Sequence, residues 1–173
     1  MASTTSQRLS SEPRPADVLV VFGITGDLAK VMTFRSLYRL EMRKLLDCPI
    51  VGVAVDDWTV DKLQEHAREC IEGTGEVLDK EVFDRFAERV SYVQGDFSNA
   101  AVYGRVADAI KGKELPVSYL GIPPFSFGTV AKGLSDVDAP PPVTPYAQGP
   151  WGPDAADELV AGHGRWHEPW VTS

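Results

Sequence analysis

The chain has 173 residues, which suits one domain, and its two cysteines have neither metal-site nor disulfide-framework spacing. The net charge of −8 argues against nucleic-acid and anionic-membrane partners, because both attract basic patches. No apolar run approaches the roughly 20 residues of a membrane span, and residues 1–15 lack the apolar stretch of a secretory signal. We therefore expect a cytoplasmic protein with a disordered tail over residues 1–15.

Residues 18–30 carry the most informative pattern in the chain. Five consecutive apolar residues, Val18–Phe22, predict a strand buried on both faces, as at the centre of a parallel sheet. Gly23 and Gly26 follow, and helix-spaced apolar residues come next. This order is typical of a pyrophosphate site, because Gly23 permits a tight turn, Gly26 permits close backbone approach and a helix start attracts anions.

An alternative for this stretch remains open. The third glycine of the G-x-G-x-x-G fingerprint is absent, so a purely structural strand-to-helix turn also fits. We interpret Asp27 as a cap, because a carboxylate in the first helical turn is favoured by the helix dipole.

The next strand is predicted over residues 50–55, with Asp56 and Asp57 directly after it. At this position of a dinucleotide fold a carboxylate accepts from the ribose 2′-hydroxyl, whereas an arginine binds a 2′-phosphate. Alternatively, the pair caps the following helix, for which Asp57 and Thr59 are both suitable. The long helix before this strand has a predicted apolar stripe at Leu28, Val31, Phe34, Tyr38, Met42 and Leu45.

Strands and helices continue to alternate up to residue 134. We expect helices near residues 63–71, 82–86, 102–110 and 125–134, and strands near 90–93 and 117–121. The alternation predicts an α/β, Rossmann-like, doubly wound parallel sheet over residues 16–134. Gly23, Asp56 and Pro123 would meet beyond the carboxyl ends of its strands, where such folds bind ligands.

The composition changes at Ser135. Residues 135–145 are predicted to be a proline-rich linker, and residues 146–173 an irregular C-terminal tail. His163 and His167 are four apart, but glycines flank the first and no third ligand is evident, so we predict no metal site.

Three stretches together resemble the coenzyme domain of glucose-6-phosphate dehydrogenases, in order and in spacing. They are residues 51–54, residues 119–124 and the turn Gly23-Ile24-Thr25-Gly26-Asp27-Leu28-Ala29-Lys30. Residues 151–159 look like the extreme C-terminus of that family. The resemblance implies oxidation of glucose 6-phosphate to 6-phosphogluconolactone with hydride transfer to a nicotinamide dinucleotide, in the pentose phosphate pathway.

The resemblance also implies where the cofactor binds. Pro123 and Pro124 would lie beside the nicotinamide, and Phe127 would stand where a tyrosine often contacts the cofactor. The residues expected to bind NADP or NAD are Gly23, Ile24, Thr25, Gly26, Asp27, Leu28, Lys30, Asp56, Pro123 and Phe127. Asp56 and Asp57 stand where NADP-using members place an arginine, and this departure favours NAD.

A second departure concerns catalysis. The family's long central region, with its catalytic histidine, does not follow residue 134. His66 is expected to be solvated and remote from the strand ends, and His163 and His167 lie in the tail, so we name no catalytic residue. The resemblance implies a glucose-6-phosphate dehydrogenase-like oxidoreductase, of which this shortened chain keeps nucleotide binding. The alternatives are a non-catalytic dinucleotide-binding module and an inactive deletion product.

Overall fold

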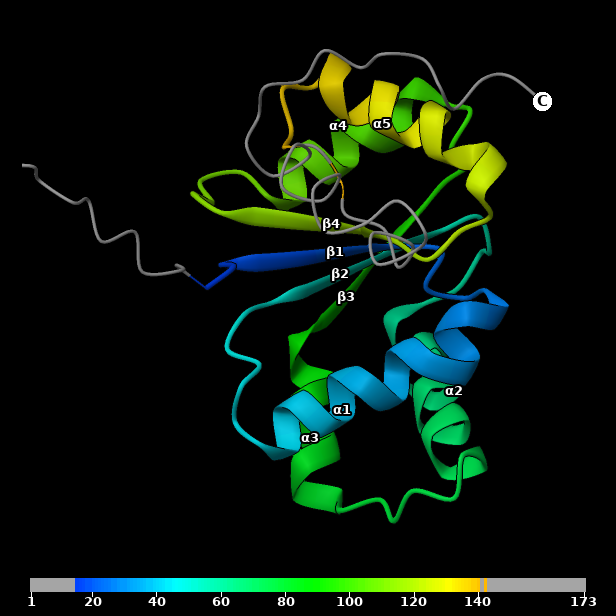
Figure 1. Cartoon of the computed structure of the whole chain (residues 1–173), viewed down its shortest axis with the longest axis vertical. Helices are drawn as coiled ribbons and strands as arrows, with labels where there is room; N and C mark the ends of the chain where they lie inside the picture. Colours follow the sequence, from blue (N-terminus) through cyan, green and yellow to red (C-terminus); the bar gives the residue numbers. More distant parts are fainter. Residues whose placement is uncertain (1–14, 141, 143–173) are drawn as a thin grey trace, which may run out of the picture.

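The computed structural model describes residues 15–140 and residue 142. Within them, four parallel strands form one sheet in the order β3-β2-β1-β4. The strands are β1 (Val18–Phe22), β2 (Ile50–Ala54), β3 (Val90–Gln94) and β4 (Pro116–Leu120). Helices cover both faces of the sheet (Figure 1). The structure thus confirms the α/β, Rossmann-like class, and the last three strands lie within one residue of their predicted bounds.

Several predictions concern residues outside this described part. Among them are residues 1–14 of the N-terminal tail, residue 141 and residues 143–145 of the linker, and the whole C-terminal tail, with His163 and His167. Within the described residues, no helix is both long and apolar enough to cross a membrane.

The helices form two layers, one on each face of the sheet. The first layer contains the π-helical turn η1 (Ala29–Thr33), α1 (Phe34–Met42), α2 (Val60–Gly73) and α3 (Lys80–Arg89). The second contains α4 (Ala100–Ala109) and α5 (Phe127–Asp136), which lie together at the top of Figure 1. A short 3-10 turn, η2 (Pro124–Ser126), precedes α5, which ends two residues beyond the predicted residue 134.

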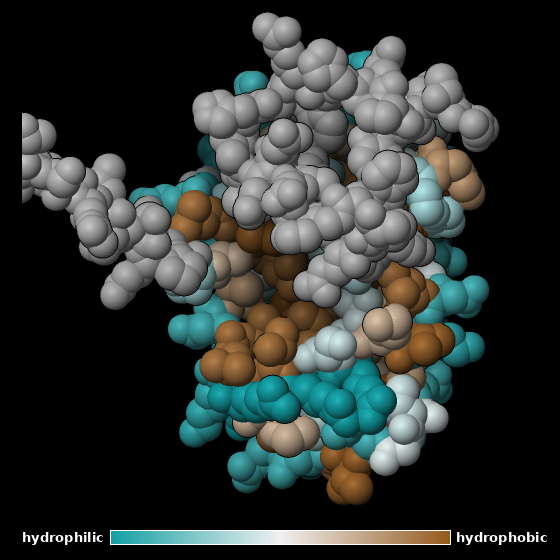
Figure 2. All heavy atoms as spheres, viewed as in Figure 1, coloured by the Kyte–Doolittle hydropathy of each residue, from teal (hydrophilic) through white to brown (hydrophobic). Residues whose placement is uncertain are grey.

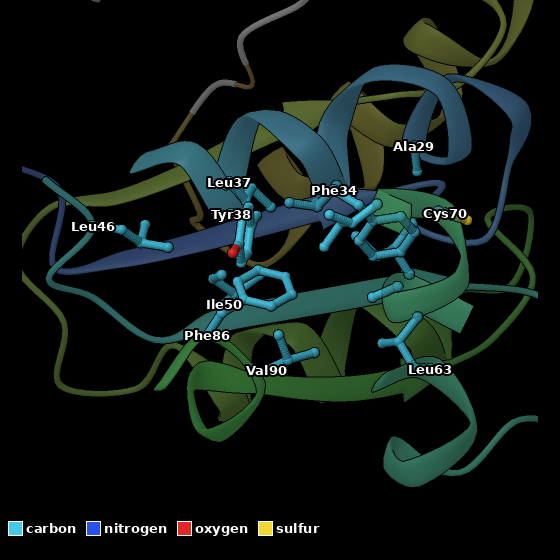
Figure 3. Close-up of a cluster of buried hydrophobic side chains, with 14 of the residues drawn as sticks. Ala29, Phe34, Leu37, Tyr38, Leu46, Ile50, Leu63, Cys70, Phe86 and Val90 are labelled. Carbon is cyan, nitrogen blue, oxygen red and sulfur yellow. The ribbon is translucent and has the colours of Figure 1, made fainter. Parts of the chain in front are cut away.

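Two apolar clusters hold these layers to the sheet. Because successive side chains of a strand point to opposite faces, Val21 packs with the first layer and Val20 and Phe22 with the second. Figure 3 shows the first cluster, in which Phe34 and Tyr38 reach down from α1 toward Ile50. Both clusters consist of residues with less than a tenth of their surface exposed.

The apolar stripe predicted for the first helix is only partly correct. Phe34 and Tyr38 are fully buried, as expected. However, the Phe34 N–H donates to the Ala29 carbonyl, five residues back, which makes the first turn a wider π turn. This turn shifts the register of the helix, and three members of the predicted stripe are exposed: Val31, Met42 and Leu45. Figure 2 shows hydrophobic residues among hydrophilic ones on the face of the molecule in view.

A buried carboxylate takes one of the freed core positions. Glu41 is 2% exposed and accepts from Arg85 Nε at 3.1 Å and from Arg89 Nε at 2.7 Å. The two charge-assisted hydrogen bonds compensate its loss of water. They also fasten α1 to α3 at the end of the sheet from which the strands start.

Candidate functional site

The loops that leave β1 and β4 meet at the carboxyl edge of the sheet. Gly23 has φ +80°, and a Cβ there would lie 2.5 Å from the Gly121 carbonyl oxygen and 2.6 Å from Ile122 Cγ2. Only glycine fits this position without displacing the backbone of the neighbouring loop. The tight turn predicted from Gly23 is therefore present.

The backbone amides of the glycine turn divide into two groups. The N–H groups of Gly23 and Ile24 both donate to the Val53 carbonyl, at 2.8 and 3.4 Å, so they tie the turn to β2. By contrast, the N–H groups of Thr25, Asp27 and Leu28 have no hydrogen-bond partner among the described residues. These three amides begin the helix and are the donors available to an anion.

The side chain of Ile24 anchors the turn from below. It is 1% exposed and lies over Gly52 in β2, where a Cβ would come within 2.9 Å of Ile24 Cγ2. Ile24 is among the residues expected to bind the cofactor, and the structure shows that its side chain belongs to the core. The role of Gly52 is not evident from the sequence, because a glycine inside a strand gives no sign of what packs on it.

Two charged residues of the turn point to solvent. Asp27 and Lys30 are both exposed. The first helical turn has no side-chain capping hydrogen bond, so the predicted capping role of Asp27 is not observed.

Asp56 lies beside the glycine turn although 31 residues separate it from Thr25. The Thr25 hydroxyl donates to Asp56 Oδ2 at 2.5 Å. The alternative that the acidic pair caps α2 is resolved in favour of Thr59, whose hydroxyl accepts from the Lys62 N–H at 3.2 Å. Asp56 and Asp57 are thus not used as caps.

The loop after β4 contributes an aromatic residue that the sequence analysis missed. Pro123 is exposed, and its carbonyl accepts from the Ser126 N–H at 3.0 Å. Phe127 is half-buried and packs against the second-layer cluster, whereas Phe125 is 87% exposed. The sequence feature that could have identified Phe125 is its position directly after two prolines.

Contrary to expectation, His66 is half-buried, and the charges that affect it include Lys30 and Asp56 of the site. Its ring lies edge-on to Trp58 and Phe34, with centroids 5.0 and 5.8 Å away, and its Nε2 is 3.4 Å from Cys70 Sγ. Burial lowers the pKa of His66, with smaller effects from Glu69 and Lys30 among nearby charges. Burial likewise raises the pKa of the Cys70 thiol.

Among the described residues, no third potential metal ligand joins His66 and Cys70. No group of three or more potential metal-ligating side chains occurs within residues 15–140 and 142. Cys70 and Cys48 are both buried free thiols, as expected for ordinary core cysteines.

Comparisons with known proteins agree on one family. The family model described as glucose-6-phosphate dehydrogenase, NAD binding domain, matches residues 20–144. The chain is 46% identical over 144 residues to glucose-6-phosphate 1-dehydrogenase 1 of Mycobacterium tuberculosis, covering 83% of this chain and 31% of the relative. It is 33% identical over 129 residues to glucose-6-phosphate 1-dehydrogenase of Caenorhabditis elegans, covering 68% and 24%.

A solved structure gives the same result. The crystal structure of glucose-6-phosphate 1-dehydrogenase from Mycobacterium avium matches with a TM-score of 0.71 and 43% identity, over 85% of this chain and 33% of that one. The chain thus spans about a third of the length of these mycobacterial relatives.

The first prediction tests the contact between the two loops. Gly23→Ala should lower the free energy of unfolding by about 2 kcal/mol or more, because the positive φ and the contact with Gly121 both oppose a Cβ. Gly75→Ala is the matched control: its φ is +78° and nothing lies within 4 Å of its Cβ position, so it should lose about 1 kcal/mol. Urea unfolding followed by circular dichroism measures both, and equal losses would contradict the contact.

The second prediction concerns pH. Because burial lowers the pKa of folded His66, the unfolded chain takes up this proton first as the pH falls. Its contribution to stability is therefore fully present above about pH 6.5 and is lost as the pH drops through the folded pKa. His66→Phe, which keeps a ring between Trp58 and Phe34, should lose less stability than the parent between about pH 7.5 and about pH 5. Parallel urea midpoints of the two proteins over this range would contradict the assignment.

Proposed function

The chain belongs to the glucose-6-phosphate dehydrogenase family, and from this membership we propose that its Rossmann-like domain binds a nicotinamide dinucleotide across the carboxyl edge of the sheet. The free amides of Thr25, Asp27 and Leu28 would bind the pyrophosphate. The loop at Pro123 and Phe127 would lie beside the nicotinamide, and the exposed ring of Phe125 lies in the same loop.

The hydrogen bond between Thr25 and Asp56 is the observation that carries this proposal. It holds the turn that would bind the pyrophosphate next to the carboxylate that would bind the adenosine ribose. Oδ2 of Asp56 is occupied by Thr25, so Oδ1 would accept from the ribose 2′-hydroxyl. One short contact thus joins the two groups that a bound dinucleotide must reach together.

We propose NAD rather than NADP as the preferred cofactor. Asp56 and Asp57 follow β2, and Asp57 is exposed beside the half-buried Asp56. A 2′-phosphate at this position would meet carboxylates and be repelled. The first residues after β2, Val55 to Trp58, include no arginine or lysine that would offset this repulsion.

We propose that the family activity, oxidation of glucose 6-phosphate in the cytoplasm, requires groups beyond the described residues. The bound cofactor would accept the hydride, but the sugar hydroxyl must also lose a proton to a base within hydrogen-bond reach. His66 is held between two aromatic rings with Cys70 at its Nε2, and this environment does not suit it to that task. The chain by itself would then bind cofactor without turnover.

Calorimetric titration of the full chain with NAD and with NADP tests this proposal. Glucose 6-phosphate is added to the same samples, and reduced nicotinamide is followed by its absorbance. The expected result is heat of binding, stronger for NAD, with no absorbance change. No binding of either dinucleotide to a folded chain would overturn the cofactor site, and turnover would overturn the inference about the missing base.

A charge-reversing variant tests the role of Asp56. Asp56→Arg should raise the ratio of NADP to NAD affinity by about tenfold or more, because a guanidinium binds the 2′-phosphate that the carboxylate repels. Asp108→Arg, an exposed position near the end of α4, makes the same charge change away from the carboxyl edge. The control should leave the ratio unchanged, and an unchanged ratio in Asp56→Arg would remove the ribose assignment.

A further inference from the structure

Tyr92 on β3 is linked by its hydroxyl to the segment that carries Asp56. We propose that Tyr92 is a positioning residue, which orients the Asp56 carboxylate toward the ribose 2′-hydroxyl of the bound dinucleotide. This inference rests on the proposed function, because it concerns how one residue of that site is held. Tyr92 acts through Asp56 and is not assigned a contact with the cofactor.

The contacts of the hydroxyl carry the argument. Tyr92 Oη donates to the Asp56 carbonyl at 2.6 Å and lies 3.3 Å from the Ala54 carbonyl. A phenol has a single proton, so the shorter contact is the main hydrogen bond. Because β3 pairs with β2 and Gly52 lies opposite Tyr92, the ring extends along β2 to the residues that follow its end.

A second donor holds the same carbonyl. The Trp58 N–H donates to the Asp56 carbonyl at 2.9 Å, and Gln94 Nε2 donates to the Val55 carbonyl at 3.2 Å. These two bonds remain when the Tyr92 hydroxyl is removed, so the segment keeps its turn. Tyr92 therefore fixes the orientation of Asp56 in a loop whose turn other hydrogen bonds already maintain.

The side chain of Asp56 is held as well as its backbone. Thr25 binds Oδ2, while Tyr92 and Trp58 hold the backbone of the same residue. Because the backbone of Asp56 and its Oδ2 are both held, the remaining oxygen, Oδ1, has a defined direction. A carboxylate that is oriented before binding loses less freedom when it meets a hydroxyl, and its hydrogen bond is correspondingly stronger.

The local charges keep Tyr92 a donor. Burial, together with the nearby carboxylates of Asp56 and Asp57, raises the pKa of Tyr92 to about 12. The hydroxyl therefore remains protonated near neutral pH and can donate to the Asp56 carbonyl throughout the range in which the protein would bind its cofactor.

The test compares two nucleotides that differ only in the group at issue. Affinities of the full chain for AMP and for 2′-deoxy-AMP are measured by calorimetry, with NAD as the reference ligand. The parent should prefer AMP, and Tyr92→Phe should reduce this preference roughly threefold to tenfold. Both nucleotides encounter the same folded fraction within one variant, so a change of stability does not alter the ratio.

Tyr103→Phe is the matched control. Tyr103 is a buried tyrosine, whereas Tyr92 is half-buried, and the Tyr103 hydroxyl likewise bonds to the backbone: it donates to the Phe97 carbonyl at 2.7 Å and lies 3.4 Å from the Thr129 carbonyl. Burial and Asp96 raise its pKa to about 12 as well. It packs in the cluster under the second helix layer, and its hydroxyl contacts Phe97 and Thr129 rather than Asp56, so its variant should keep the parent ratio.

Each other outcome would overturn the inference. A parent that binds AMP and 2′-deoxy-AMP equally would show that Asp56 does not accept a hydrogen bond from the 2′-hydroxyl. Equal losses for both nucleotides in Tyr92→Phe would show a merely structural role. If that variant does not fold, Thr25→Val, which releases the other end of the carboxylate, should reduce the same preference, and an unchanged ratio would contradict the proposal. A parent that binds neither NAD nor AMP would refute the proposed function itself.

Discussion

The candidate site depends on the close approach of two loops at the carboxyl edge of the sheet. The Gly23 N–H donates to Val53 on one side at 2.8 Å, and the Gly121 N–H donates to Phe22 on the other at 2.9 Å. The absence of a Cβ at Gly23 lets its backbone pass directly against the Gly121 carbonyl. The turn is therefore fixed to both neighbours of β1, and the first amides of the helix have defined directions before any ligand arrives.

Rigidity of the turn also depends on what lies beneath it. Ile24 fills the space over Gly52, so the turn rests on a strand whose own residues are all buried. The amides of Gly23 and Ile24 bond to β2, and those of Thr25, Asp27 and Leu28 have no partner in the part of the chain that the structure describes. This division between anchoring and available donors explains how a short segment can be part of the core and still present an anion-binding surface.

The sequence predicted the elements well because their causes are local. The buried strand and the glycine turn each depend on residues that adjoin one another, and so does the cap of α2, where Thr59 is one of two suitable residues. The missed features depend on partners far along the chain. Glu41 is buried because Arg85 and Arg89, 44 and 48 residues away, meet it, and the contact of Thr25 with Asp56 spans 31 residues. The π turn at Ala29–Thr33 shifted the apolar stripe without any break in its spacing.

The groups proposed to bind the cofactor come largely from one unit, β1 with its helix and β2. The free amides follow β1 and Asp56 follows β2, and the hydrogen bond from Thr25 joins them. Affinity for the adenosine half would thus arise from a stretch of about 40 residues whose geometry is set by its own strands. Hydride transfer from a sugar, in contrast, needs a base within hydrogen-bond reach of the sugar hydroxyl. On the proposed function, cofactor binding and turnover would therefore be separable properties of this chain.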